Sequence, residues 1–222
     1  MVPFTTGDFF AVFADYNHGV WPMQLVLAGL AVGSIALSWR PAGSSRHLVM
    51  GVLALLWIWM GAVYHLGYFA TINPAAYIFG LLFVTQGLLF LRAARRHRLS
   101  FRATRDRYGW TGALLALYAL VLYPLFGLLA GHTYPASPTF GAPCPTVIFT
   151  FAILLWSESA VPRHLLVVPL LWSILGGSAV FELGVIEDVG LLVAGPVATW
   201  LILRRNAAIQ NELLPSRLQT VR

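Results

Sequence analysis

The chain has 222 residues, of which 59% are hydrophobic and only 10% are charged, and its formal net charge is +6. Soluble domains carry roughly 25% charged residues, so this composition indicates a polytopic membrane protein and excludes an ordinary soluble enzyme. All fourteen Lys+Arg residues are arginines, and the lack of lysine excludes a P-loop ATPase and a retinal Schiff base. No soluble basic domain carries the positive charge, so it does not indicate a nucleic-acid partner.

Residues 1–20 are the first predicted element, a short amphipathic helix lying on the outer membrane interface. Thr5 and Asp8 have the spacing of a capping box, and Asn17-His18-Gly19 is expected to end the helix. One face is apolar at helical spacing, through Phe9, Phe13, Tyr16 and Val20. The simplest role for such a helix is to anchor the chain at the membrane surface.

Seven apolar stretches follow, each near the length of about 20 residues that crosses the hydrocarbon of a bilayer. They lie near residues 21–39, 47–67, 74–92, 108–131, 145–160, 162–184 and 187–203. The predicted fold class is therefore all-α, a polytopic membrane bundle of seven transmembrane helices within residues 21–205. A cytoplasmic tail is predicted at 206–222.

The arginines occupy alternate joints between these stretches and leave the other joints empty. They lie at Arg40 and Arg46, in a block from 92 to 107, at Arg163, and from Arg204 to the end. Short cytoplasmic loops are enriched in basic residues, so the N-terminus is predicted outside and the C-terminus inside. The arginine-rich loop at 92–107 is expected to contact anionic lipid.

Two of the stretches resemble each other. Residues 46–67 and 163–184 align without gaps and match at eight positions. This suggests parallel repeat units at 21–92 and 145–205, joined by a linker helix at 108–131. Such an arrangement resembles the 3+1+3 architecture of SWEET sugar transporters, although that family's Pro-Gln signature is missing at Pro22-Met23. Chance similarity between Leu-, Val- and Ala-rich helices is the alternative.

Ionisable and polar groups gather at the predicted outer ends of the helices. The candidate binding residues are Tyr64, His65, His132, Cys144, Glu182, Glu187 and Asp188. In the proposed repeat His65 and Glu182 are equivalent, so an imidazole and a carboxylate would approach from opposite halves. That pair suits a divalent metal ion or a hydrogen-bonded polar solute.

The metal hypothesis rests on His65, His132, Cys144 and Glu182, although their spacing matches no compact zinc motif. The proline-rich linker 131–145 is expected to fold over the outer mouth and bring Cys144 near His132. The alternative is that these groups face water at the interface, with Glu187 and Asp188 favoured by the helix dipole.

Haem is a weaker cofactor hypothesis. His47 and His164 at the inner ends, and His65 and His132 at the outer ends, form the two depth-matched pairs that a di-haem protein needs. Each histidine is equally consistent with an interfacial position, so the sequence provides no specific evidence for a cofactor.

Three segments together resemble a family of uncharacterised bacterial multi-pass inner-membrane proteins, a domain-of-unknown-function family. They are residues 16–22 (YNHGVWP), residues 60–77 and residues 138–146 (PTFGAPCPT). The resemblance covers nearly the whole chain. It implies a multi-pass protein of the bacterial inner membrane and provides no activity and no catalytic residues.

Three functions are compatible with the sequence. Binding or transport of a small solute or metal ion through the outer polar site is favoured, because polar groups converge there from several segments. An accessory or scaffold subunit of a membrane complex is the alternative, with another membrane protein or a second copy of the chain as partner. A membrane enzyme ranks last because no nucleophile–base pair is recognisable.

Overall fold

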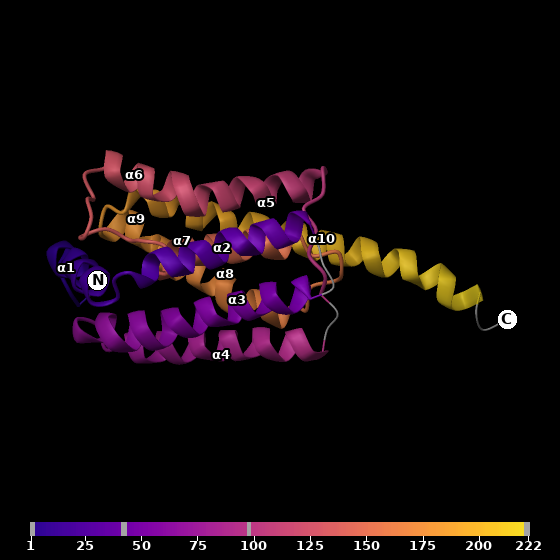
Figure 1. Ribbon diagram of the computed structural model, residues 1–222, viewed down its shortest axis with the longest axis horizontal. Coiled ribbons are helices and arrows are strands. Elements are labelled where there is room, and N and C mark those ends of the chain that lie inside the picture. Colours follow the sequence, from indigo (N-terminus) through magenta and orange to yellow (C-terminus); the bar gives the residue numbers. More distant parts are fainter. Residues whose placement is uncertain (1–2, 41–43, 97–98, 220–222) are drawn as a thin grey trace.

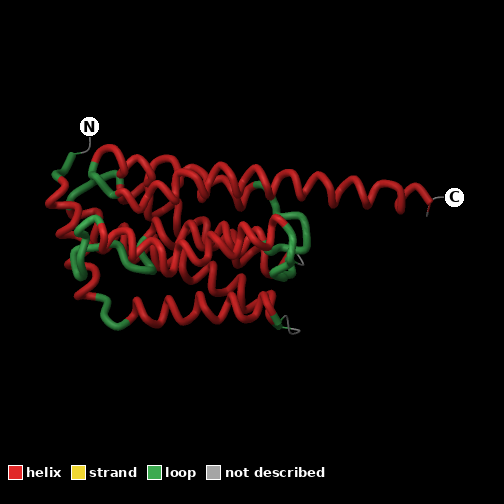
Figure 2. The backbone as a smooth tube through the Cα atoms, turned by 90° about the horizontal axis from the view of Figure 1, so that it is seen from above, coloured by secondary structure: helices red, strands yellow, loops and turns green. Residues whose placement is uncertain are grey.

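The computed structural model describes residues 3–40, 44–96 and 99–219, with side chains described as far as residue 211. Regular structure in these residues is helical apart from two isolated bridges. Figure 2 shows the helices and the loops that join them. The first half contains α1 (Thr6–Gly19), α2 (Met23–Trp39), α3 (Ser45–Trp59), η1 (Met60–Tyr68), η2 (Phe69–Thr71) and α4 (Ala76–Arg96). The second half contains α5 (Arg107–Leu117), η3 (Tyr118–Leu122), α6 (Tyr123–Leu129), α7 (Pro143–Leu155), α8 (His164–Leu175), η4 (Gly176–Ser178), α9 (Ala179–Glu182), η5 (Ile186–Asp188) and α10 (Val189–Gln219).

The long helices run side by side in one bundle (Figure 1). Within the described residues, five helices are long and apolar enough to cross a membrane, or six if α1 and α2, which are bent by 84° at their junction, count as one broken span. The all-α class is thereby confirmed. The fifth predicted span, residues 145–160, corresponds to α7, which has only 13 residues and is shorter than the spanning helices. α10 continues as a helix well past residue 203, where the sequence placed the end of the last span.

The bundle has two chemically different ends. The α1 end is formed by α1, the connection from α6 to α7 and the turn from α9 to η5 (Figure 1). The arginine end lies opposite, where α2 and α4 end and α3, α5 and α8 begin, and it carries the arginines of those connections. Arg98 lies outside the described residues, as do the side chains of Arg217 and Arg222. The sequence predicted that the arginines occupy alternate connections between the helices. In the structure these connections lie together at one end of the bundle.

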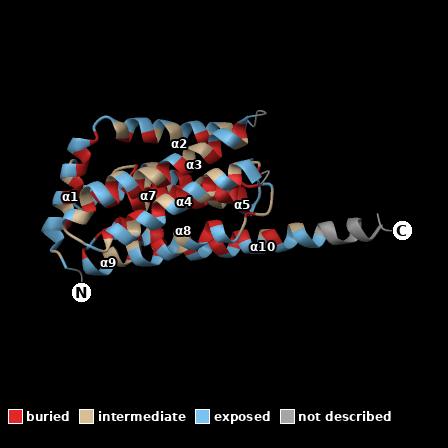
Figure 3. Ribbon diagram, turned by 90° about the horizontal axis from the view of Figure 1, so that it is seen from below, coloured by how far each residue is buried: buried red, intermediate tan, exposed pale blue. Residues whose placement is uncertain are grey.

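Helix α7 is the centre of the bundle. All but one of its 13 residues are buried, whereas its neighbours bury one face and expose the other (Figure 3). It packs against α5 and α10, and Thr150 accepts a hydrogen bond of 2.9 Å from the indole of Trp57 in α3. The nearly uniform hydrophobicity of this helix, without a polar stripe, follows from its being surrounded on all sides.

Ordered chain segments close both ends of α7. At the arginine end, Arg102 donates a backbone hydrogen bond to Trp156 and Glu158 donates one to Ser100. Asn206 of α10 binds both backbone groups of Val161, at 2.7 and 2.9 Å. These bonds satisfy backbone polar groups that would otherwise be unpaired in a buried loop.

At the α1 end, Asn17 fastens the proline-rich connection between α6 and α7. Its amide donates hydrogen bonds to the carbonyls of Pro135 and Ser137, at 2.6 and 2.8 Å, and its carbonyl oxygen accepts one from Thr139. The capping box predicted at Thr5 and Asp8 is confirmed. The predicted apolar stripe of α1 is buried against the bundle, so this helix covers its end.

Asp106 is the N-cap of α5 and gives a first prediction. Its carboxylate accepts hydrogen bonds from the Gly109 N–H and the Thr104 hydroxyl, at 2.8 and 2.7 Å. Partial burial acts to raise its pKa, but these bonds and the Arg205 guanidinium outweigh burial and hold the pKa below its ordinary value. We expect Asp106→Ala to lower the free energy of unfolding by about 1 kcal/mol at neutral pH.

The effect is expected to depend on pH. Because the folded pKa lies below the unfolded one, the carboxylate stabilises the fold above about pH 4, and this contribution is lost as the pH falls through the folded value. Unfolding curves in mixed micelles should therefore converge for the wild type and Asp106→Ala on acidification. Asp106→Asn, which keeps a capping side chain, is the control. Equal losses in both variants would argue against the cap.

Candidate functional site

A cavity of about 160 Å³ lies within the α1 end. Seven aromatic side chains line it, six of them from α1, η1, η2, α4 and α8: Phe4, Phe9, Phe13, Tyr64, Phe69, Phe79 and Trp172. Its polar lining includes Cys144 at the start of α7, Glu182 at the end of α9 and Asp188 in η5. The cavity is thus mainly apolar, with a few polar groups that converge from separate elements, which is the usual build of a small-molecule site.

Irregular helix geometry borders this cavity. Helix α8 is followed directly by the 3₁₀ turn η4. Gly176 and Ser178 of this turn line the cavity. Tyr64 comes from η1, a π-helix that continues α3. π-Helical turns within α-helices occur frequently at functional sites. Gly184, with φ +75°, lets the chain turn from α9 into η5 and so directs Glu187 and Asp188 inward.

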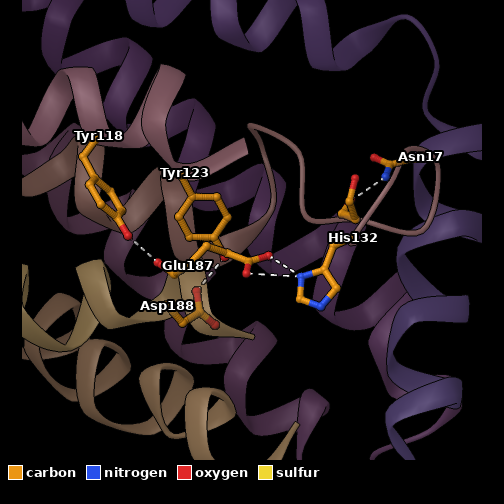
Figure 4. A network of polar contacts seen from close by, with 7 residues as sticks. Asn17, Tyr118, Tyr123, His132, Glu187 and Asp188 are labelled. Atoms are coloured by element: carbon orange, nitrogen blue, oxygen red, sulfur yellow. Dashed lines mark hydrogen bonds and ion pairs between the residues drawn. The ribbon is translucent and has the colours of Figure 1, made fainter. Parts of the chain in front are cut away.

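Asp188 is buried in the wall of the cavity, with 1% of its surface exposed. Its carboxylate accepts a 2.6 Å hydrogen bond from the hydroxyl of Tyr123 (Figure 4). It also contacts the thiol of Cys144. No ion pair links it to a cation among the described side chains. The indole of Trp172 lies close to the same thiol, but its buried N–H has no hydrogen-bond partner of good geometry.

Glu187 points away from Asp188 and pairs with His132 (Figure 4). The Nδ1 atom of His132 lies 2.9 and 3.2 Å from the two carboxylate oxygens of Glu187, whose side chain is fully buried. Gly127 leaves room for this carboxylate, since a Cβ atom there would lie 2.9 Å from Oε1. The hydroxyl of Tyr118 donates to the backbone carbonyl of Glu187 at 2.7 Å. This pair fastens the α6–α7 connection to the start of α10.

His65 is completely buried, and neither ring nitrogen has a hydrogen-bond partner. Its ring packs edge-on against aromatic neighbours, the nearest being Phe83 and Trp172, with ring centroids 4.7 and 5.0 Å away. It does not line the cavity, although Trp172 and three further ring neighbours do: Tyr64, Phe69 and Phe79. His65 therefore lies behind the aromatic wall.

The structure brings together part of the predicted set. Tyr64, Cys144, Glu182 and Asp188 line one cavity, and His132 and Glu187 form a neighbouring pair. Hydrogen bonds and ion pairs within the described residues do not join His65 to Glu182, and they join Cys144 to Asp188 rather than to His132. Within the described chain, no three His, Cys, Asp or Glu side chains are placed to hold a metal ion together.

Sequence reasoning missed Trp172 and Tyr123, because an aromatic residue within an apolar span carries no signal of its own partner. It interpreted Phe9 and Phe13 only as a membrane anchor. Their spacing on one helical face with Tyr16 equally predicts contact with protein, and this is the signal that was available.

The fold and the cavity define a class: an all-helical bundle whose long apolar helices are compatible with a membrane protein. The chain belongs to the DUF6064 family, a family of unknown function, which matches residues 6–212. This confirms the resemblance to an uncharacterised family. No curated protein and no solved structure matches the chain.

Proposed function

We propose that this chain is a seven-span protein of the bacterial inner membrane that binds a small organic solute in the α1-end cavity, as the first step of transport. The α1 end faces outward in this proposal, because the arginines at the opposite end match the bias of cytoplasmic loops. The observation that carries the proposal is the cavity itself, which combines an aromatic wall with a buried carboxylate beside broken helices.

Seven crossings require α7 to count as a span although it is only about 20 Å long at the rise of an α-helix. A helix that contacts lipid at that length would mismatch the bilayer, but α7 is enclosed by its neighbours. The buried loops at both of its ends complete the crossing, which is permitted where irregular backbone is covered by protein.

An organic solute fits the site better than a metal ion does. The surface of the cavity is mainly apolar, and within the described residues no three His, Cys, Asp or Glu side chains could hold a metal ion together. Helices interrupted beside a central site are also a feature of secondary transporters, where the breaks supply backbone groups and freedom to move.

Chemical labelling of Cys144, which is the only cysteine, tests whether the cavity is accessible. We expect neutral methyl methanethiosulfonate to modify it in sealed right-side-out vesicles. Ala179 lines the cavity, so Ala179→Phe is expected to slow this reaction at least about tenfold. Ala130→Phe makes the same change at an exposed position outside the cavity and is the control.

Loss of labelling in Ala179→Phe alone would support a solute cavity. An unchanged rate in that variant would show that reagents reach Cys144 by another route, and the scaffold hypothesis would then be the better one. With a charged thiosulfonate that does not cross the membrane, such as MTSET, labelling seen only in inside-out vesicles would reverse the proposed orientation.

A further inference from the structure

We infer that the occupant of the α1-end cavity is an organic cation, such as an amine or a quaternary ammonium compound, with Asp188 as its counter-ion. The inference rests on the proposed function, because it names the substrate class of the same site. Three features carry it: the charge of this end of the bundle, the buried carboxyl group of Asp188, and the aromatic residues that line the cavity.

The first feature is the charge at the α1 end. Five acidic residues lie on the elements of this end: Asp8, Asp15, Glu182, Glu187 and Asp188. The described arginines lie at the opposite end, so histidines are the only basic side chains on those elements. His132 is already committed to Glu187. A cleft lined by one sign of charge with low-dielectric walls concentrates ions of the opposite sign, here cations.

The second feature is the buried carboxyl group of Asp188, which has no cationic partner among the described side chains. Buried carboxylates in proteins are normally paired with a cation or bound to a metal, because transfer of an isolated charge out of water is costly. Asp188 has a hydroxyl and a thiol as neighbours and no cationic partner within the described side chains. It lines the cavity, so a bound cation would supply the missing charge. Glu182, exposed at the end of α9, provides a second carboxylate on the same cavity.

The third feature is the aromatic wall. Faces of tryptophan, tyrosine and phenylalanine attract cations, and cages of such rings recognise quaternary ammonium groups. Seven aromatic residues line the same cavity as Asp188: Phe4, Phe9, Phe13, Tyr64, Phe69, Phe79 and Trp172. A small anion would meet the carboxylates, and a neutral sugar would find few hydrogen-bonding groups. Carboxyl groups and aromatic rings together favour a ligand that carries a positive charge on an otherwise apolar molecule.

The test uses the wild-type chain and thiosulfonate reagents that differ in charge. Cys144 lines the cavity and contacts Asp188, so its modification rate reports which reagents enter. We expect the trimethylammonium reagent MTSET to react at least about tenfold faster than the sulfonate reagent MTSES, after each rate is divided by that of the neutral methyl reagent. The ratio should fall towards one in Asp188→Asn.

Asp15→Asn is the matched control, because Asp15 is exposed on α1 and does not line the cavity. If the ratio of the MTSET rate to the MTSES rate fell equally in both variants, the preference for the cationic reagent would come from the surface potential. That result would overturn the role of Asp188. Equal rates for the two charged reagents on the wild type would overturn the cation inference. If the neutral reagent still reacted and Ala179→Phe still blocked it, the solute cavity itself would stand.

A second measurement uses the wild-type chain alone. It therefore tests the inference even if Asp188→Asn does not fold. Choline and 3,3-dimethylbutan-1-ol have nearly the same shape and differ in the charge of the central atom. We expect choline to slow the reaction of Cys144 with the neutral methyl reagent and the uncharged alcohol to have less than about a tenth of that effect at equal concentration. Equal protection by both compounds would contradict a site for cations.

Discussion

Replacing His132 by alanine is expected to lower the free energy of unfolding by about 3 kcal/mol at neutral pH. The Glu187 carboxylate is fully buried and binds the His132 ring nitrogen at 2.9 Å, so the substitution leaves it without its partner. Removal of one member of a buried pair typically costs 3–5 kcal/mol, and the partial exposure of His132 favours the lower value. Unfolding in mixed micelles, followed by tryptophan fluorescence, measures the difference.

A double-mutant cycle separates the pair from simple loss of packing. In a Glu187→Gln background the buried side chain is neutral, so His132→Ala should cost less than about 1 kcal/mol there. A cost that is the same in both backgrounds would show that His132 stabilises the fold through its contact with Phe10, whose ring centroid lies 4.5 Å away, rather than through Glu187.

The helix positions could be predicted from the sequence because they depend on local properties. Apolar runs, proline at helix starts and the alternation of arginine along the chain all act through neighbouring residues or through the bilayer. The capping box at Thr5 and the break at Asn17 to Gly19 are also local, and both agree with the structure.

The partners within the site could not be predicted in the same way. Asp188 of η5 meets Cys144 of the first turn of α7 although the two residues lie far apart in the sequence, and no periodicity along the chain specifies that contact. The same holds for His65. Its place at the end of a long apolar stretch is compatible with a polar mouth, but the π-helix in that region leaves it among aromatic rings. Whether residues 46–67 and 163–184 are a true repeat also stays a prediction.

Replacing Gly61 by leucine is expected to lower the free energy of unfolding by roughly 2–3 kcal/mol. Gly61 lies where the continuous helix of α3 and η1 contacts α4. A Cβ atom at Gly61 would lie 2.7 Å from the Gly80 carbonyl oxygen and 2.9 Å from the Val84 backbone nitrogen. Backbone atoms cannot rotate away as a side chain can, so the two helices would have to separate. Membrane helices associate closely through such small residues, and overpacking typically costs 1–3 kcal/mol.

Gly51→Leu is the matched control, because Gly51 lies on the same rod and a Cβ atom there would meet nothing within 4 Å. This substitution should leave stability unchanged or raise it slightly, since leucine favours a helix more than glycine does. Unfolding of both variants under the same conditions gives the comparison. If both lost the same stability, the cost would come from inserting leucine into this rod and not from the contact at Gly61. If only Gly61→Leu lost stability, the close approach of these two helices would depend on the absence of a side chain at Gly61. The short distances from the Cβ position to backbone atoms of α4 lead us to expect this result.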